Sequence, residues 1–278
     1  MTEVVAHHGI FKDTHLHVDD TGGPGRPVVL IHGWPLSGEA WSAQVPALAD
    51  AGYRVVTYDR RGFGRSDTPR SGYDYDTFSD DLAALLTELE LTDVTLVGFS
   101  MGGGEVARYA SRHGVERLRS VVLAGAVTPY MAQTEDNPDG PLDDETAQTF
   151  EKGVKDDPHA FYDQFTTMFF SVGEELKVSE EQRQQALALC DQSDQKASLG
   201  AMEAFGTTDF REDLSAVTVP TLVMHGAGDG VVPFDGSGKR THEAIAGSEL
   251  VVVDDAPHGF NVSHAEEFNR ALLEFLAR

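Results

Sequence analysis

Short aliphatic and β-branched runs alternate along the chain with segments whose apolar residues recur every three or four positions. The runs that predict strands are 28-VVLIHG-33, 55-VVTY-58, 95-TLVGF-99, 120-SVVLAG-125, 219-VPTLVMHG-226 and 249-ELVVVD-254. Helical spacing appears in 77-TFSDDLAALLTELEL-91, from Ser100 to about His113, and in 264-HAEEFNRALLEFLAR-278. Because the strand-like runs lack polar alternation, helices are expected on both faces of the sheet. The pattern predicts an α/β fold with a mostly parallel sheet.

The middle of the chain has a different pattern, with no strand-like run between about Ala126 and Phe210. The segments with turn-rich or helical character in this part are 134-TEDNPDGPLDDET-146, 160-AFYDQFTTMFF-170 and 179-SEEQRQQALALCD-191. We therefore predict an α/β core made of residues 1–125 and 211–278, with a helical cap at 126–210 inserted late in the sheet. A lid over a site is the functional interpretation of the cap, and a purely structural excursion is the alternative.

The excess of acidic side chains limits the kinds of molecule that this chain is expected to bind. The sequence has 21 basic and 46 acidic side chains, a net charge of −25. Such a surface repels phosphate groups, so nucleic acid and membranes are not expected partners. Solubility is the simpler interpretation of the charge, and adaptation to high salt is the alternative. The N-terminal MTEVVAHHGI does not resemble a secretory signal and the single Cys190 fits a reducing compartment, so a cytoplasmic location is expected.

Ser100 lies in the pentapeptide 98-GFSMG-102, between a predicted strand and a predicted helix. This is the context of a nucleophile elbow, in which the chain turns sharply and the serine takes a strained conformation. Small residues two positions either side let the strand and the helix approach closely. A chance match in a loop is the alternative, but the strand–turn–helix context favours Ser100 as a nucleophile.

A serine nucleophile needs N–H donors for the oxyanion that forms during attack on a carbonyl. The backbone N–H of Met101 is one candidate, because the first N–H groups of a helix have no intrahelical acceptor. The second is expected from the loop after an early strand. That loop is 32-HGWPLSG-38, and its candidate is the N–H of Trp34, since Pro35 has none. His32 is interpreted as a hydrogen-bonded support of the loop.

In α/β enzymes with such an elbow, the base follows the serine in the chain and the acid lies between them. His258 follows the last predicted strand, at the edge of the sheet where parallel strands place catalytic groups. Asp229 follows the preceding strand, 258 − 229 = 29 residues before His258, enough for one helix and one strand. Asp254 and Asp255 compete for this role, but they are close to His258 in its own loop. A surface-loop histidine is the alternative interpretation of His258.

Motifs spread over nearly the whole chain carry a family resemblance. They are 32-HGWPLSG-38, 58-YDRRGFGRS-66, 73-YDYDTFSDDL-82, 97-VGFSMGGGEVARY-109, 135-EDNPDG-140, 208-TDFREDL-214, 219-VPTLVMHG-226 and 256-APHG-259. Together they resemble the α/β-hydrolase superfamily. More narrowly, they resemble the bacterial cofactor-free haloperoxidase, perhydrolase and esterase family, with the strongest likeness to the actinobacterial non-haem bromoperoxidases.

The resemblance implies that Ser100, Asp229 and His258 are nucleophile, acid and base, with the N–H groups of Trp34 and Met101 as oxyanion donors. It also implies that no haem, other cofactor or metal takes part, and that the chain forms trimers or hexamers. Members of the family hydrolyse short acyl esters and make peracids when peroxide replaces water; the peracid then oxidises halide without the enzyme. The expected partners are therefore a small ester or carboxylic acid and hydrogen peroxide.

Pro35, Phe99 and Phe260 are candidates for the substrate pocket. The resemblance implies that a proline after the tryptophan positions a carbonyl near the acyl-enzyme and favours peroxide; a rigid loop is the simpler interpretation of Pro35. An aromatic side chain more often belongs to the plain core than to a pocket. The cap is the least similar part of the chain, so the resemblance says least about the substrate.

The sequence leaves two other functions open. A lactonase or γ-lactamase uses the same three side chains on cyclic acyl substrates, and only the pocket shape separates it from an esterase. A hydrolase-like binding protein would capture a ligand with little turnover, which the intact serine, acid and histidine set disfavours. Haloalkane dehalogenases and epoxide hydrolases place an aspartate at the elbow, so Ser100 argues against both.

Overall fold

The computed structural model describes residues 2–7 and 13–278. Its framework is an eight-stranded sheet in the order β1-β2-β4-β3-β5-β6-β9-β10. The strands are β1 (Thr2–His7), β2 (Asp13–Asp20), β3 (Pro27–Ile31), β4 (Arg54–Tyr58), β5 (Val94–Phe99), β6 (Leu118–Ala124), β9 (Thr221–Gly226) and β10 (Glu249–Val253). β2 runs antiparallel to both its neighbours, and every other adjacent pair is parallel. The predicted mostly parallel sheet is confirmed.

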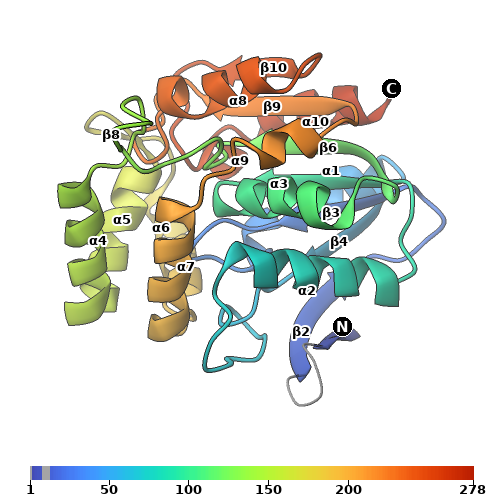
Figure 1. The fold of residues 1–278 in the computed structure, drawn as a ribbon, viewed down its shortest axis with the longest axis horizontal. Helices are drawn as coiled ribbons and strands as arrows, with labels where there is room; N and C mark the ends of the chain where they lie inside the picture. The colour runs from blue at the N-terminus through green and yellow to red at the C-terminus, as the bar shows by residue number, and fades with distance from the viewer. Residues whose placement is uncertain (1, 8–12) are drawn as a thin grey trace.

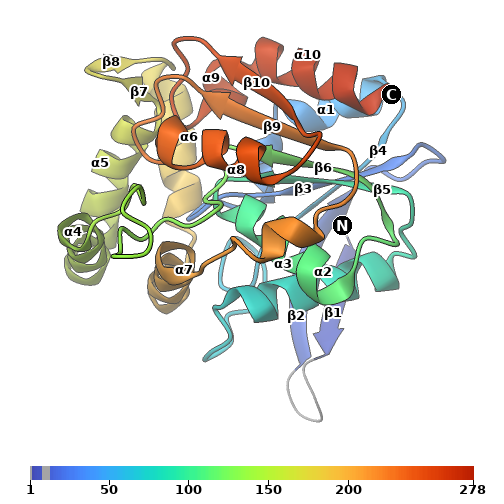
Figure 2. The same ribbon diagram turned by 45° about the horizontal axis from the view of Figure 1, so that its top comes forward.

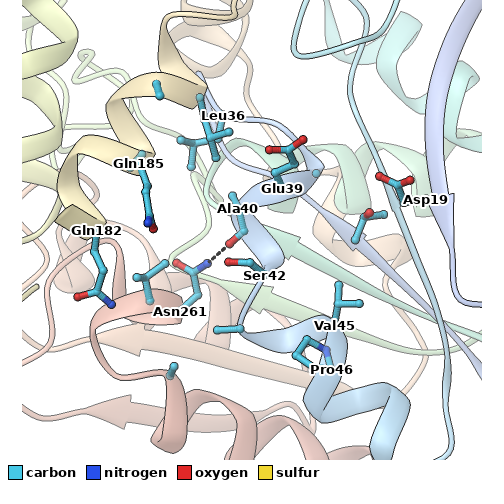
Figure 3. Close-up of a pocket in the computed structure, with 18 of the residues that line it drawn as sticks. Asp19, Leu36, Glu39, Ala40, Ser42, Val45, Pro46, Gln182, Gln185 and Asn261 are labelled. Atoms are coloured by element: carbon cyan, nitrogen blue, oxygen red, sulfur yellow. Dashed lines mark hydrogen bonds between the residues drawn. The ribbon is translucent and has the colours of Figure 1, made fainter. Parts of the chain in front are cut away.

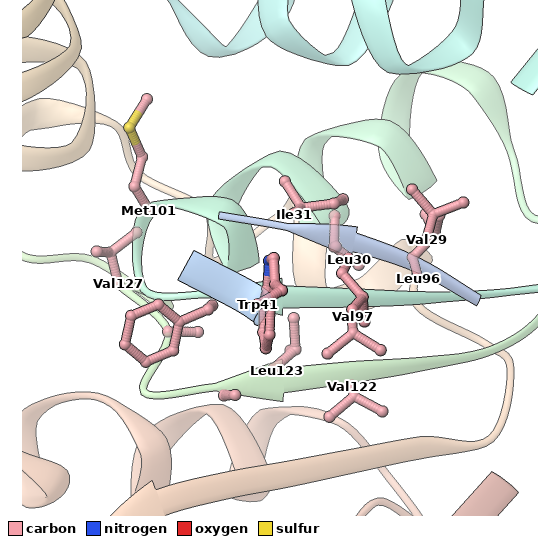
Figure 4. Packing of buried hydrophobic residues seen from close by; sticks show 14 of the residues in the cluster. Val29, Leu30, Ile31, Trp41, Leu96, Val97, Met101, Val122, Leu123 and Val127 are labelled. Atoms are coloured by element: carbon pink, nitrogen blue, oxygen red, sulfur yellow. The ribbon is translucent and has the colours of Figure 1, made fainter. Parts of the chain in front are cut away.

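Helices cover both faces of the sheet (Figures 1 and 2). One face carries α1 (Gln44–Asp50) and α10 (Ala265–Leu276), the latter preceded by the short α9 (Phe260–Ser263); the other carries α2 (Tyr75–Glu88), α3 (Met101–His113) and α8 (Gly238–Ala244). Every residue of β5 is buried, which explains the absence of polar alternation. Figure 4 shows Leu30, Val97 and Val122 of three adjacent strands packed near Trp41 of the 3₁₀ helix η1 (Gly38–Trp41). No helix in the described part of the chain is long and apolar enough to span a membrane.

The segment between β6 and β9 forms a helical cap. Its elements are α4 (Asp144–Asp156), α5 (Pro158–Phe169), β7 (Ser171–Val172), β8 (Glu175–Leu176), α6 (Glu180–Cys190) and α7 (Gln195–Thr207). Figures 1 and 2 both show the four helices grouped at one end of the sheet. Each helix begins at a side chain that accepts a backbone N–H of its first turn, namely Asp143, Asp157, Ser179 and Asp194. All four lie inside the predicted cap range, whose boundaries stay a prediction.

Trp34 of the core holds the cap in place. Its indole Nε1–H donates to the carbonyl oxygen of Ser198 in α7 at 3.0 Å. Its ring contacts the aromatic side chains of Phe161, Tyr162, Phe165 and Phe205, with centroid distances of 5.3–6.3 Å. Edge-to-face aromatic contacts of this kind each add to the stabilisation from burial alone. The loop proposed to supply an oxyanion donor is therefore fixed to the cap by the same residue.

Several elements had no counterpart in the sequence prediction. β2 lies near the edge of the sheet, where buried Leu16 and Val18 alternate with polar neighbours, so no continuous apolar run marks it. α4 begins inside the segment that was interpreted as turn-rich. α7 contains Gly200 and Gly206, which weaken a helical pattern. A Cβ on Gly200 would lie 2.8 Å from Tyr73 Cβ, so close packing of cap on core explains that glycine.

Candidate active site

Ser100 occupies a sharp turn between β5 and α3. Its backbone has φ 54° and ψ −119°, a positive φ that is strained for a residue with a side chain. A Cβ on Gly98 would lie 2.4 Å from the Gly102 carbonyl oxygen, and a Cβ on Gly102 would lie 2.5 Å from the Ile31 carbonyl oxygen. Only glycine allows β5, α3 and β3 to approach this closely. The turn has the geometry predicted for an elbow and places the serine hydroxyl at the carboxyl end of β5.

We expect Gly102→Ala to prevent stable folding or to cost about 3 kcal/mol or more of unfolding free energy. The new methyl group would meet the backbone of β3, which cannot rotate away as a side chain can. Urea denaturation measures the effect. Gly230→Ala is the matched control, because a Cβ there meets nothing within 4 Å. Equal stability of the two variants would contradict this account of the turn.

Three side chains that are far apart in the sequence form one hydrogen-bonded chain at the carboxyl ends of β5, β9 and β10. His258 Nε2 lies 2.9 Å from Ser100 Oγ, and His258 Nδ1 lies 2.6 Å from Asp229 Oδ2. All three side chains are buried. Because a carboxylate only accepts, Nδ1 carries the ring proton and Nε2 faces the serine hydroxyl as a base. The arrangement can remove a proton from Ser100 and stabilise the resulting imidazolium.

The Asp229 carboxylate is held by donors on both oxygens. Oδ1 accepts the N–H groups of Val231 at 2.9 Å and Val232 at 2.7 Å. Burial raises the pKa of this carboxyl, but the charge of His258 and hydrogen bonds from His225 and His258 outweigh it, so the pKa lies below its ordinary value. Asp229 is thus suited to remain ionised beside His258.

Asp254 and Asp255, the two other candidates for the acid that binds His258, face solvent. Asp254 and Asp255 are exposed in the turn that follows β10. Asp255 Oδ2 pairs with Lys177 Nζ at 2.8 Å. The acid that lies at the ring of His258 is therefore the distant Asp229, as the sequence analysis favoured.

The N–H groups of Trp34 and Met101 are both available beside Ser100. Met101 is the first residue of α3 and has no intrahelical acceptor. The Trp34 loop lies against the elbow, since a Cβ on Gly33 would be 3.1 Å from Ser100 Cβ. Among the residues that the structure describes, neither N–H has an acceptor. Both can therefore donate to an oxygen atom of a ligand at Ser100.

His32 and Arg60 fix the Trp34 loop relative to α3. His32 Nδ1–H donates to the Gly33 carbonyl oxygen at 2.8 Å, and His32 Nε2 accepts the Arg60 N–H at 2.9 Å. The Arg60 guanidinium donates to the His32 carbonyl oxygen at 2.9 Å and to Glu105 Oε2 at 2.8 Å. Because Glu105 belongs to α3, a buried ion pair joins the loop to the helix that begins after Ser100. These contacts agree with the predicted role of His32 as a loop support.

Because of His32, the free energy of unfolding should decrease as the pH is lowered below about 6.5. Burial, assisted by the charge of Arg60, lowers the pKa of His32 to about 3. In the unfolded chain the value is about 6.5, so the unfolded state binds more protons between these two pH values. Wild type should lose about 1.4 kcal/mol per pH unit more than His32→Asn as pH falls below 6.5. Urea unfolding at several pH values measures both slopes, and parallel slopes would contradict the prediction.

A cavity of about 990 Å³ lies between the core and the cap and includes Ser100 in its lining. This volume is typical of small-molecule sites. The apolar walls come from Trp34, Tyr73, Val231 and Val232 of the core and from Val127, Met131, Leu142, Phe150, Phe165, Met168, Leu199, Met202 and Phe205 of the segment between β6 and β9. The cap therefore supplies much of the surface that a ligand at Ser100 would contact, which agrees with its interpretation as a lid.

The residues predicted for the pocket lie elsewhere. Pro35, Phe99 and Phe260 are absent from the lining of the cavity. The Phe99 ring lies 5.1 Å from the His258 ring and 6.3 Å from the Phe260 ring, measured between centroids. Phe99 and Phe260 are buried, and it is the rings of Phe99 and Phe169 that pack against His258. The prediction that Pro35, Phe99 and Phe260 line the substrate pocket is therefore corrected. The cap, the part of the chain least similar to the family, supplies aromatic rings such as Phe165 to the cavity.

A second cleft, of about 890 Å³, lies between α6 and the segment around η1 and α1 (Figure 3). Figure 3 shows Gln182 and Gln185 of α6 across from Ala40, whose carbonyl oxygen accepts a hydrogen bond from Asn261 Nδ2 at 3.2 Å. None of the hydrogen-bonded side chains at the elbow lines this cleft. Across the described ranges, no three His, Cys, Asp or Glu side chains are grouped so that they could hold a metal ion.

Two buried polar side chains near the site, Glu105 and His225, have no clear signal in the sequence. Glu105 occupies an ordinary position in a helical pattern, and nothing in its spacing shows that its carboxylate is buried. His225 ends an apolar run four residues before Asp229. That position, at the end of a strand and beside the acid loop, was the only signal available for it.

Comparison with known proteins places the chain in a family. Residues 26–265 match the family described as the α/β hydrolase fold. The chain is 46% identical over 257 residues to a non-haem chloroperoxidase of Kitasatospora aureofaciens, covering 91% of this chain and 93% of that one. It is 38% identical over 263 residues to a bifunctional esterase/perhydrolase of Acinetobacter calcoaceticus, covering 92% and 94%. A bromoperoxidase crystal structure from Bacillus anthracis has a TM-score of 0.96 and 52% identity, with 100% of both chains covered. The chain therefore belongs to the α/β-hydrolase superfamily and, within it, to the family of non-haem haloperoxidases and esterases.

Proposed function

We propose that this chain is a serine hydrolase that cleaves short-chain carboxylic esters through an acyl-enzyme and makes peracids when hydrogen peroxide replaces water. The observation that carries the proposal is the hydrogen-bonded chain from Ser100 through His258 to Asp229, with Ser100 in the lining of a mostly apolar cavity between core and cap. The chloroperoxidase and esterase/perhydrolase relatives support both parts of the proposal.

In the first half of the reaction, Ser100 Oγ attacks the ester carbonyl carbon while His258 Nε2 takes the hydroxyl proton. The carbonyl oxygen becomes an oxyanion and accepts hydrogen bonds from the N–H groups of Trp34 and Met101. Asp229 keeps the His258 ring in the correct tautomer and stabilises its positive charge. Collapse of the intermediate breaks the bond to the alcohol oxygen, which takes the proton from His258 and leaves an acyl group on Ser100.

In the second half, water or hydrogen peroxide gives a proton to His258 Nε2 and attacks the acyl carbon. Water releases a carboxylic acid, and peroxide releases a peracid; in both cases Ser100 recovers its proton from His258. The choice between the two nucleophiles is therefore made after the acyl-enzyme has formed.

Peracid formation tests this proposal. Purified, metal-stripped protein is given ethyl acetate and hydrogen peroxide, and peracetic acid is measured beside the Ser100→Ala variant. We expect peracid from the wild type alone. If neither protein makes peracid, the perhydrolase part is wrong, and hydrolysis of p-nitrophenyl acetate then decides between an esterase and a binding protein with little turnover.

A further inference from the structure

His225 is a buried histidine to which the mechanism gives no role. It lies in β9, four residues before Asp229, and is 0% exposed. Its Nε2 lies 2.8 Å from the Val232 carbonyl oxygen and 3.3 Å from Asp229 Oδ2. Both oxygens only accept, so Nε2 carries the proton and its N–H is shared between them. The shorter contact goes to the carbonyl oxygen.

The Nδ1 side of the His225 ring is packed against Phe234 and Gly238. Nδ1 has no hydrogen-bond partner among the described residues. It is packed against Gly238, where a Cβ would lie 2.4 Å away, and the ring of Phe234 of η3 (Phe234–Gly236) lies 5.5 Å from its own. The donor of this ring is therefore Nε2–H, which is aimed at the acid loop.

The turn from Asp229 to Val232 is fixed from two directions. The Val232 N–H donates to Asp229 Oδ1 at 2.7 Å, and the carbonyl oxygen of the same residue accepts from His225. His225 itself stands on a buried strand, so it connects a loop to a rigid element of the sheet. Its N–H also lies near the carboxylate oxygen that binds His258. The hydrogen bond from His225 is one of the causes that lower the pKa of Asp229.

We propose that His225 is a positioning residue for the acid of the triad. It holds the Asp229 carboxylate in the place and orientation at which that group binds the Nδ1–H of His258. The inference rests on the proposed roles of Ser100, Asp229 and His258. Without the His225 donor, the Val232 carbonyl keeps only the longer contact from Ser237 Oγ at 3.4 Å. The Asp229 carboxylate then loses the constraint that His225 places on Oδ2 and on the turn, and its position relative to His258 is less tightly fixed. Removal of the His225 donor should therefore weaken the stabilisation of the His258 imidazolium during attack, and it should leave the contacts with the substrate unchanged.

The test compares His225→Leu, which has no donor, with His225→Gln, whose side-chain amide can donate near the position of Nε2. The control is His242→Leu, which removes a histidine of α8 that bonds Ser248 at 2.8 Å, outside the site. kcat and KM for p-nitrophenyl acetate are normalised to active sites titrated with a fluorophosphonate, so loss of folded protein does not count. We expect kcat to fall about 10- to 100-fold in His225→Leu, the range for one hydrogen bond to a charged group. KM should change little, and His225→Gln should recover most of the loss.

Proton NMR supplies a readout that does not depend on turnover. The 2.6 Å bond between His258 Nδ1 and Asp229 Oδ2 predicts a far-downfield proton signal. The signal should move upfield or exchange faster in His225→Leu and stay in place in His225→Gln. If His225→Leu does not fold, His225→Asn, whose shorter amide does not reach the turn, takes its place.

Two results would overturn the inference: wild-type kcat per titrated site in the donor-free variant, or an unchanged downfield signal. A wild type that neither hydrolyses esters nor reacts with the fluorophosphonate would instead refute the proposed function. In that case the NMR signal still decides whether His225 positions Asp229. The two failures are therefore distinguishable.

Discussion

Ser100→Ala should abolish ester hydrolysis and peracid formation while the fold stays intact. The change removes the atom that we propose forms the bond to the acyl group, and His258 Nε2, 2.9 Å from that atom, then has no hydroxyl to activate. Loss of a serine nucleophile that works with a histidine lowers kcat by roughly 10⁴- to 10⁶-fold. The apolar cavity and the N–H donors remain, so a substrate analogue should still bind.

Steady-state kinetics with p-nitrophenyl acetate and thermal unfolding measure the two halves of this prediction. Ser215→Ala is the matched control, because Ser215 is an exposed serine of η2 (Asp213–Ala216) outside the site. The control should behave as wild type in both measurements. A Ser100→Ala protein that folds and retains more than about a hundredth of wild-type activity would contradict the role of Ser100.

Glu105→Ala should strongly destabilise the protein, because it removes one partner of a buried ion pair. Burial raises the pKa of the Glu105 carboxyl, and the charge of Arg60 opposes that effect. Glu105 Oε2 accepts from Arg60 Nε at 2.8 Å, and Tyr58 donates to the other oxygen. Removing the carboxylate leaves a buried guanidinium without its counter-ion, which costs about 3–5 kcal/mol.

Urea unfolding measures this loss of unfolding free energy. Two further variants show whether it comes from the buried ion pair. Asp156→Ala breaks the exposed pair with Lys152 and should change stability little. Arg60→Met combined with Glu105→Leu removes both charges and should recover much of the stability. Equal losses from Glu105→Ala and Asp156→Ala would show that the buried pair does not hold the loop and helix together.

The Trp34 loop connects these observations. Its backbone faces Ser100, its indole is bound by the cap, and His32 at its start is held by Arg60. We therefore expect changes in the cap or in the buried ion pair to displace the Trp34 N–H that is proposed as an oxyanion donor.

The sheet and the elbow could be predicted from the sequence because their causes are local. A parallel strand that is buried along its whole length, such as β5, needs mostly apolar residues, and the turn at Ser100 needs glycine at positions 98 and 102. The order of Ser100, Asp229 and His258 follows from the order of the strands that carry them. The hydrogen bonds of the structure agree with that assignment.

The pocket and the supporting polar groups could not be predicted because their causes are tertiary. Phe99 follows the strand pattern and was assigned to the cavity, yet its ring packs against His258. Phe165 resembles any apolar residue of a helix, and only the fold of the cap directs it to the cavity. The burial of Glu105 and the aim of His225 depend on residues far away in the sequence, so no spacing reveals them.

The central claim is that Ser100 forms a covalent bond to the acyl group of the substrate. The most direct test is to mix the protein with p-nitrophenyl acetate, quench it in acid within milliseconds, and map the modified peptide by mass spectrometry. We predict one acetyl group per chain, on Ser100, absent from Ser100→Ala and from protein treated first with a fluorophosphonate. Product formation without any acetyl group on Ser100, or with acetylation of another residue, would contradict the account.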